Sequence, residues 1–79
     1  QQGLVERAIS AYQRVLALFP DVYQAQNNLA NLLLEARRPA EALQHAERAL
    51  ALQPGDPLPR VNIGRALLLL DRPAEAVPH

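Results

Sequence analysis

The chain has 79 residues, enough for one small domain with a modest core. Eight arginines balance eight acidic residues, and lysine and cysteine are absent, which argues against a basic nucleic-acid surface, a polybasic membrane patch, disulfides and thiolate metal sites. Leucine and alanine dominate, and no apolar stretch is long enough to span a membrane. We therefore expect a helical protein with no nucleic-acid partner and no membrane association.

Four segments place apolar residues three or four positions apart, which is the spacing of one face of an α-helix. No segment alternates with a period of two, so we expect an all-α protein without strands. The expected apolar stripes are, in chain order, Val5, Ala8, Ile9, Tyr12, Val15, Leu16 and Phe19; Val22, Ala25, Leu29, Leu32, Leu33 and Ala36; Ala42, Leu43, Ala46, Ala49 and Leu50; and Ile63, Ala66, Leu67 and Leu70.

Proline marks the junctions between these segments. Pro20 follows the first, while Asp56 precedes the fourth as the expected N-cap, with Pro57 at the first helical position. Pro39 and Pro73 stand where the third helix and a further one would begin, because a first turn leaves the N–H that proline lacks unpaired anyway. Connections this short predict that neighbouring helices pack antiparallel.

The sequence repeats itself with a period of about 34 residues, a length typical of helix–turn–helix repeats. Pro20 recurs as Pro54, Asn28 recurs as Asn62, and the run Arg-Pro-Ala-Glu-Ala at residues 38–42 recurs at 72–76. A fixed period of this length is the signature of a stacked repeat architecture.

Two antiparallel helices in each period resemble the tetratricopeptide repeat. Residues 23–56 are identified as one complete repeat, residues 3–22 as the second helix of a preceding repeat and residues 57–79 as a partial following one, all within a single segment 1–79. The resemblance implies that the helix pairs stack as part of an α-solenoid. It is carried by Ala8, Tyr12, Val15 and Pro20; by Leu29, Ala30, Leu33, Ala42, Ala46, Ala49 and Pro54; and by Ile63, Gly64, Leu67 and Ala76.

Small residues at several of these places predict that helix backbones approach closely there. They are Ala8, Ala30, Ala42, Ala49 and Gly64. The sequence also departs from the family pattern. Gln26 and Arg60 replace a large side chain, which predicts a thinner core. Another place that is often glycine is occupied by Gly3, Arg37 and Asp71.

The chain starts without methionine and in the middle of a repeat, so we expect an excised piece of a longer array. A cut array exposes faces that neighbouring repeats would cover, and we expect self-association or end-to-end stacking at these ends. No signal peptide is visible, which favours a cytoplasmic over a secreted protein.

The resemblance implies that first helices line a concave groove that binds an extended peptide or a partner helix. The residues expected to face it are Gln24, Asn27, Asn28, Asn31, Leu34 and Glu35, then Leu58, Val61, Asn62, Arg65, Leu68 and Leu69. An asparagine amide can donate to a peptide carbonyl and accept from a peptide N–H together. Asn28 and Asn62 would therefore repeat as a ladder, similar to that in the repeat arm of O-linked N-acetylglucosamine transferases. The other interpretation is that both are structural or merely solvated.

Two further comparisons concern the same face. Asn28 and Arg65 match two residues of the carboxylate clamp in co-chaperone repeat domains, but Val61 stands where that clamp has lysine. Arg65 would otherwise be a solvated charge. The leucines 34, 58, 68 and 69 lie off the core stripe and would either form an apolar patch for a partner or pack on a further helix.

Catalysis and metal binding find little support. His45 and its repeat equivalent His79 have no acidic ligand beside them, so we interpret both as solvated. Ser10, the sole serine, has no histidine and aspartate arranged around it, and no glycine-rich phosphate loop is present. Glu41 is explained by the dipole of the helix whose first turn it occupies. We therefore expect no enzyme activity, cofactor or metal.

Three functional hypotheses remain open. The first is a protein-interaction scaffold that holds a peptide. The second is a non-catalytic, substrate-recruiting arm of a larger enzyme such as a glycosyltransferase. The third is a homo-oligomerisation module in which the segment Leu58–Leu70 meets its own copy.

Overall fold

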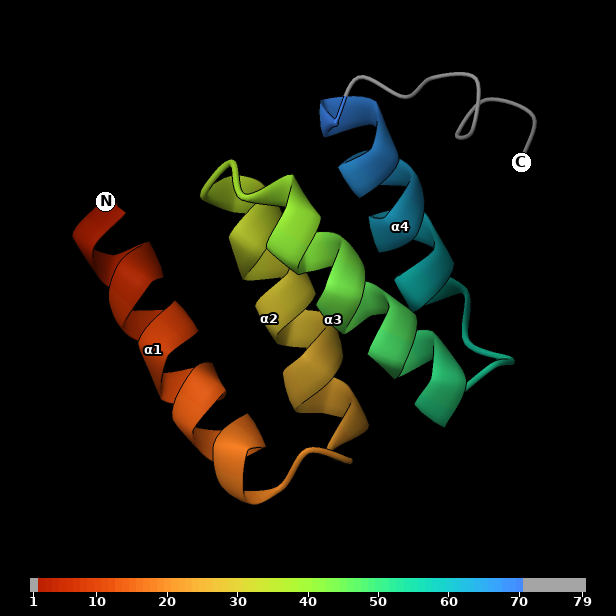
Figure 1. Ribbon diagram of the computed structural model, residues 1–79, viewed down its shortest axis with the longest axis horizontal. Helices are drawn as coiled ribbons and strands as arrows, with labels where there is room; N and C mark the ends of the chain where they lie inside the picture. Colours follow the sequence, from red (N-terminus) through yellow and green to blue (C-terminus); the bar gives the residue numbers. More distant parts are fainter. Residues whose placement is uncertain (1, 71–79) are drawn as a thin grey trace.

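The structure, a computed structural model, describes residues 2–70, with side chains from residue 3 onward. Four helices fill this range: α1 (Gln2–Leu18), α2 (Tyr23–Glu35), α3 (Pro39–Leu52) and α4 (Pro57–Leu69). Residues 2–70 contain no strand, which confirms the all-helical fold. Figure 1 shows consecutive helices running in opposite directions, and each packs against the next along the chain. The principal extents are 35 × 29 × 15 Å. The stacking of further repeats into a solenoid stays a prediction.

The starts of α3 and α4 follow local sequence signals. Pro39 begins α3, and Glu41 lies in its first turn. At α4 the Asp56 carboxylate accepts a hydrogen bond from the Leu58 N–H at 3.0 Å, which confirms the predicted N-cap. This hydrogen bond, and then the neighbouring Tyr23 hydroxyl, lowers the pKa of Asp56. Burial, and then the same carboxylate, raises the pKa of Tyr23 to about 12.

The end of α2 is closed by a left-handed residue. Arg37 has φ 62°, and its N–H donates to the Leu34 carbonyl at 3.1 Å, while the Arg38 N–H donates to the Leu33 carbonyl at 2.8 Å. These two bonds are the Schellman arrangement that usually places glycine at the left-handed position. A side chain there costs about 1–2 kcal/mol relative to glycine. Arg37 therefore holds a strained conformation that the family's frequent glycine would relieve.

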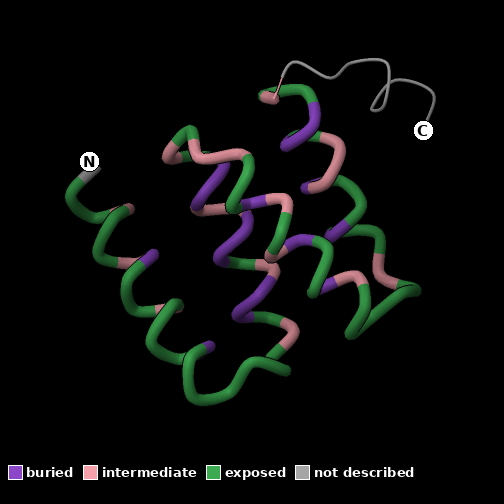
Figure 2. Tube along the Cα trace, viewed as in Figure 1, coloured by how far each residue is buried: buried purple, intermediate pink, exposed green. Residues whose placement is uncertain are grey.

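The core runs along α2, which packs against α1, α3 and α4. Figure 2 shows buried positions along α2, α3 and α4, with most of them on α2, and fewer on α1. The buried residues of α3 are all alanines, at positions 42, 46 and 49, so the backbones of α2 and α3 approach closely as predicted. The buried core cluster contains Ile9, Leu16, Ala25, Leu29, Leu33, Leu34, Ala42 and Ala66.

Three members of the predicted stripes lie outside the core. Val15, Phe19 and Val22 are exposed. Val15 belongs to α1, which within residues 2–70 contacts only α2, while Phe19 and Val22 lie in the connection between these two helices. The prediction of close packing at Gly64 is also wrong for the described part of the chain. A Cβ atom added at Gly64 would meet no atom within 4 Å there.

Gln26 fills the core rather than thinning it. Its side chain is 1% exposed, its Nε2 donates to the Pro20 carbonyl at 2.8 Å, and its Oε1 lies 2.7 Å from the His45 Nδ1. The Pro20 carbonyl can only accept a hydrogen bond, so the amide nitrogen of Gln26 points toward it and the amide oxygen, Oε1, faces the imidazole. In a neutral His45 the proton must therefore be on Nδ1, which donates to Oε1. His45 is therefore half-buried and bonded, not solvated as the sequence suggested. The prediction of a thinner core is wrong at Gln26.

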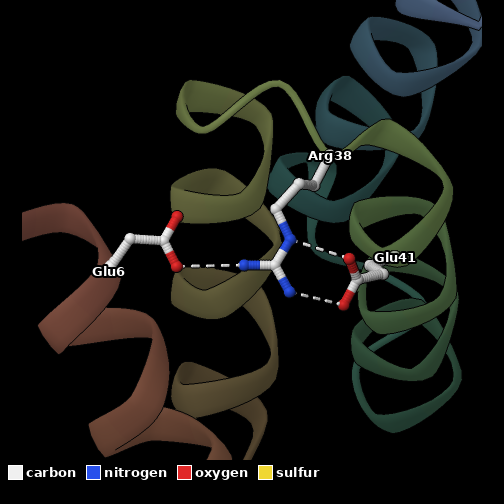
Figure 3. A network of polar contacts seen from close by, with 3 residues as sticks. All are labelled: Glu6, Arg38 and Glu41. Carbon is white, nitrogen blue, oxygen red and sulfur yellow. Dashed lines mark hydrogen bonds and ion pairs between the residues drawn. The ribbon is translucent and has the colours of Figure 1, made fainter. Parts of the chain in front are cut away.

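Arg38 ties three elements together in the loop between α2 and α3. Its guanidinium donates to both oxygens of Glu41, at 2.7 and 2.9 Å, and to Glu6 of α1 at 3.2 Å (Figure 3). The bond from Arg38 lowers the pKa of Glu41. Glu41 thus has a second role beyond the helix dipole, as one of two carboxylates that neutralise Arg38.

Candidate functional site

The predicted binding residues lie on α2 and α4, which contact each other. The 34-residue period predicts that these two helices belong to successive repeats. Of the twelve residues predicted to face the groove, the structure leaves eight exposed, two half-buried and two buried. The exposed ones are Gln24, Asn28, Glu35, Leu58, Val61, Arg65, Leu68 and Leu69; the half-buried ones are Asn27 and Asn31; and the buried ones are Leu34 and Asn62.

A chain of amide hydrogen bonds joins α2 to α4. The Asn62 Nδ2 donates to Asn27 Oδ1 at 3.0 Å, and the Arg65 Nη1 donates to Asn31 Oδ1 at 3.0 Å and to Asn62 Oδ1 at 3.4 Å. Asn31 in turn donates to Glu35 at 3.3 Å. Arg65 is thus held in place by two neutral amides, and it is not the merely solvated charge that the sequence also allowed.

The two asparagines of the predicted ladder have different surroundings. Asn62 is 6% exposed, and both its amide nitrogen and its amide oxygen are bonded within the α2–α4 interface. Asn28 is exposed, and its Nδ2 donates to the Tyr12 hydroxyl of α1 at 3.3 Å. Asn62 therefore has a structural role here, and the expectation of two equivalent exposed amides is wrong.

An open groove lies between the C-terminal ends of α2 and α4. Its volume is about 440 Å³. Six residues line it: Leu34, Glu35, Arg37, Arg65, Leu68 and Leu69. Leu34 is 3% exposed and belongs to the core, so its predicted place off the core stripe is wrong. Sequence reasoning missed Arg37 as a site residue. Its departure from the usual glycine was the available signal.

No group of three or more metal-ligating side chains occurs within residues 2–70. Burial, and then the nearby Arg48 charge, lowers the pKa of His45, which keeps its ring neutral more readily. His79, which the sequence analysis also interprets as solvated, lies outside the described residues. Ser10 is exposed. No helix in the described range is both long and apolar enough to cross a membrane.

Comparison with known proteins identifies the repeat. Residues 1–57, more than half of the chain, match the family described as tetratricopeptide repeat. None of the curated proteins compared with the chain matches it. Tetratricopeptide repeats are in general protein-interaction scaffolds and are typically not catalytic. The helix pairs, the repeat period and this match together show that the chain belongs to the tetratricopeptide repeat family.

Proposed function

We propose that this chain binds an extended segment of a partner protein across the exposed faces of α2 and α4. One observation carries the proposal: this surface combines a pre-ordered amide network with large apolar side chains left open to solvent. The amides of Asn27, Asn31 and Asn62 are already fixed by hydrogen bonds. Val61 and Leu68, on α4, are both more than half exposed.

Such a surface suits an extended peptide for a physical reason. A peptide without secondary structure brings unpaired N–H and C=O groups, and asparagine amides offer matching donors and acceptors. Asn28 donates to Tyr12, and its Oδ1 has no intramolecular donor within residues 2–70. The bonded amides of Asn27, Asn31 and Asn62 hold α2 and α4 together before the ligand arrives, so less conformational entropy is lost on binding.

The test is a panel of short synthetic peptides presented to the 79-residue chain, with amide chemical shifts mapped by NMR. Binding peptides should shift resonances on α2 and α4, and Asn28→Ala and Val61→Ser should each weaken binding without lowering the melting temperature. Gln44→Ala is the matched control, since Gln44 is an exposed amide on α3. Shifts confined to α1 and α3, or equal losses for Gln44→Ala, would refute the proposal.

Self-association predicts a different result from the same surface. If α4 meets a second copy through Leu58, Val61 and Leu68, then Leu68→Glu converts dimers to monomers in sedimentation velocity. In the peptide-binding proposal the wild-type chain stays monomeric at low concentration, and Leu68→Glu changes only the affinity for peptide. A concentration-dependent dimer that Leu68→Glu abolishes would favour the oligomerisation module instead.

A further inference from the structure

The groove at the C-terminal ends of α2 and α4 combines positively charged side chains with exposed apolar ones. Two guanidinium groups and two exposed leucines line one open space. A second open space, lined by Pro20, Gln26, Arg48 and Leu52 among others, carries one arginine and one aspartate and has no comparable charge excess.

The side-chain charge of the first groove is not neutralised by ion pairs within the described residues. Arg37 and Arg65 form no ion pair with a carboxylate there, whereas Arg38, next in sequence to Arg37, is paired with Glu6 and Glu41 (Figure 3). Glu35 is the one acidic residue of the lining, and it accepts from Asn31. Two positive charges thus face one negative charge, so the lining carries a net charge of +1.

The Arg65 side chain is held in one orientation by hydrogen bonds from a single nitrogen. Its Nη1 donates to the two asparagine oxygens, while Nε and Nη2 have no acceptor among residues 2–70. A guanidinium held by neutral amides keeps its full charge, and its remaining N–H groups can donate side by side to a carboxylate.

Arg37 adds an independent observation. The left-handed backbone that ends α2 favours glycine, yet an arginine is present, and its side chain lines the groove. Backbone strain retained at a surface position is a recognised mark of functional sites. Part of the effect of Arg37 is to offset the partial negative charge at the end of α2. Each of the two helix ends contributes roughly half a negative charge, which together with Glu35 balances the two arginines in number. The attraction to an anion therefore comes from the directed N–H donors of Arg65 and Arg37 and not from a charge excess.

We infer that this groove binds an acidic side chain of the partner segment, with an adjacent apolar side chain of the same segment packed on Leu68 and Leu69. The inference rests on the proposed function and specifies its ligand. Arg65 and Arg37 contact the carboxylate, and the exposed faces of the two leucines cover the neighbouring apolar side chain. Charge complementarity selects the acidic residue, because a lysine at that place would face two guanidinium groups.

The probes are end-capped peptides that differ only at one pair of residues: Glu-Leu, Gln-Leu, Lys-Leu and Glu-Ser. Fluorescence anisotropy with the 79-residue chain should rank Glu-Leu first, about three- to tenfold above Gln-Leu and Glu-Ser, with Lys-Leu weakest. The gap between Glu-Leu and Gln-Leu should shrink as salt rises, because both guanidinium groups are solvent-accessible. Equal affinities for Glu-Leu and Gln-Leu would overturn the inference.

Arg37→Gly separates binding from folding. It removes the guanidinium and relieves the left-handed strain, so the melting temperature should rise while affinity for Glu-Leu falls about threefold or more. Arg65→Gln should lower affinity for Glu-Leu and leave affinity for Gln-Leu unchanged. Arg14→Gln, at an exposed arginine of α1, is the matched control and should change neither. Arg37→Gly binding Glu-Leu as tightly as the parent chain would count against the inference.

Two further arms identify the source of the carboxylate. Leaving the C-terminus of the Gln-Leu peptide uncapped should not restore affinity, because the inference assigns the carboxylate to a side chain; full restoration would overturn that assignment. Asp71→Asn should not change affinity for Glu-Leu. Tighter binding in Asp71→Asn would mean that the chain's own carboxylate occupies the groove, which also overturns the inference.

Failure of this inference is distinguishable from failure of the proposed function. If all four peptides bind with equal affinity and still shift resonances on α2 and α4, the proposed function stands and the preference for an acidic residue is wrong. If none of them shifts α2 or α4 while other peptides do, the inference again fails alone. If no peptide of any sequence shifts these helices, both fail.

Discussion

The 34-residue period predicts that helices α2 and α4 occupy the same place in successive repeats, but their side chains have opposite surroundings at several positions 34 residues apart. Leu34 is 3% exposed, whereas Leu68, its equivalent in the next repeat, is 55% exposed. Gln26 is buried and hydrogen-bonded, whereas its equivalent Arg60 is exposed. The two asparagines of the predicted ladder reverse this order, with Asn28 exposed and Asn62 buried.

The difference shows that a repeat position takes its role from its neighbours. Helix α2 packs against α1, α3 and α4, while α4 packs, within the described residues, against α3 and α2. Asn62 is buried because its side chain meets Asn27 and Arg65 between the two first helices. Asn28 has α1 beside it and reaches the Tyr12 hydroxyl instead.

The largest contrast is expected for the leucine pair. Leu34→Ala removes buried methyl groups and leaves a cavity in the core, so we expect a loss of about 2–5 kcal/mol in the free energy of unfolding. Leu68→Ala removes exposed groups and should change it by less than about 0.5 kcal/mol. Urea denaturation followed by circular dichroism measures both. A loss for Leu68→Ala as large as that for Leu34→Ala would show that α4 is covered as fully as α2.

The polar pair should show the second largest contrast. Gln26→Ala leaves the Pro20 carbonyl and the His45 N–H without their partner, and we expect a loss of about 1–3 kcal/mol. Arg60→Ala, at the equivalent exposed place, should stay within about 0.5 kcal/mol of the parent chain. His45→Ala is the control, because it removes one of the two bonds and should cost less than Gln26→Ala. Equal stability of all four proteins would refute the structural role of Gln26.

Local features of this fold could be predicted from sequence because they depend on adjacent residues. The Asp56 cap, the start of α3 at Pro39 and the breaks between helices all follow from side chains within a few positions of the site. The close packing at the alanines of α3 could also be predicted, because the repeat period aligns them with small residues of the family. The four helices of residues 2–70 confirm the predicted helical class, and the match over residues 1–57 confirms the predicted family.

The candidate site was harder to predict because it depends on contacts across repeats. The burial of Asn62 requires knowing that Asn27 and Arg65 meet it. The bond between Gln26 and His45 joins residues 19 apart, and neither residue carries a pattern that names the other. Arg37 was visible as a departure from glycine, but its side chain's place in the groove depends on α4. Asn28 and Asn62 are the same residue type one period apart, so the sequence pattern alone does not predict that one is exposed and the other buried.

A smaller contrast is expected for the pair of small residues, Ala30 on α2 and Gly64 on α4. Gly64→Ala should raise the free energy of unfolding by about 0.5–1 kcal/mol, because a Cβ finds open space among the described residues and alanine favours helix. Ala30→Gly should lower it by about 1 kcal/mol or more, since Ala30 is fully buried. Thermal melts of the two variants test this pair. A destabilising Gly64→Ala would show that another segment approaches α4 there.

The smallest effect concerns the pH dependence of the Gln26–His45 pair, which has no described counterpart at Arg60. Burial first, and then Arg48, lowers the pKa of His45 in the folded state below its ordinary value of about 6.5. The unfolded chain therefore binds more protons as the pH falls through about 6.5, and stability should decrease in that direction until the folded-state pKa is reached.

His45→Gln should remove this slope between about pH 7 and 5, when both proteins carry His79→Gln so that no other histidine titrates. Glu41 and Asp56 act in a separate window: their pKa values are lowered by folding, so they lose stabilisation as the pH falls below about 5. Because protonated His45 can still donate from Nδ1 to Gln26, the loss reflects desolvation of the charge and not a broken hydrogen bond. Gln26→Ala should therefore flatten the slope only if the ring moves toward solvent. An unchanged slope in His45→Gln would assign the pH dependence to other groups.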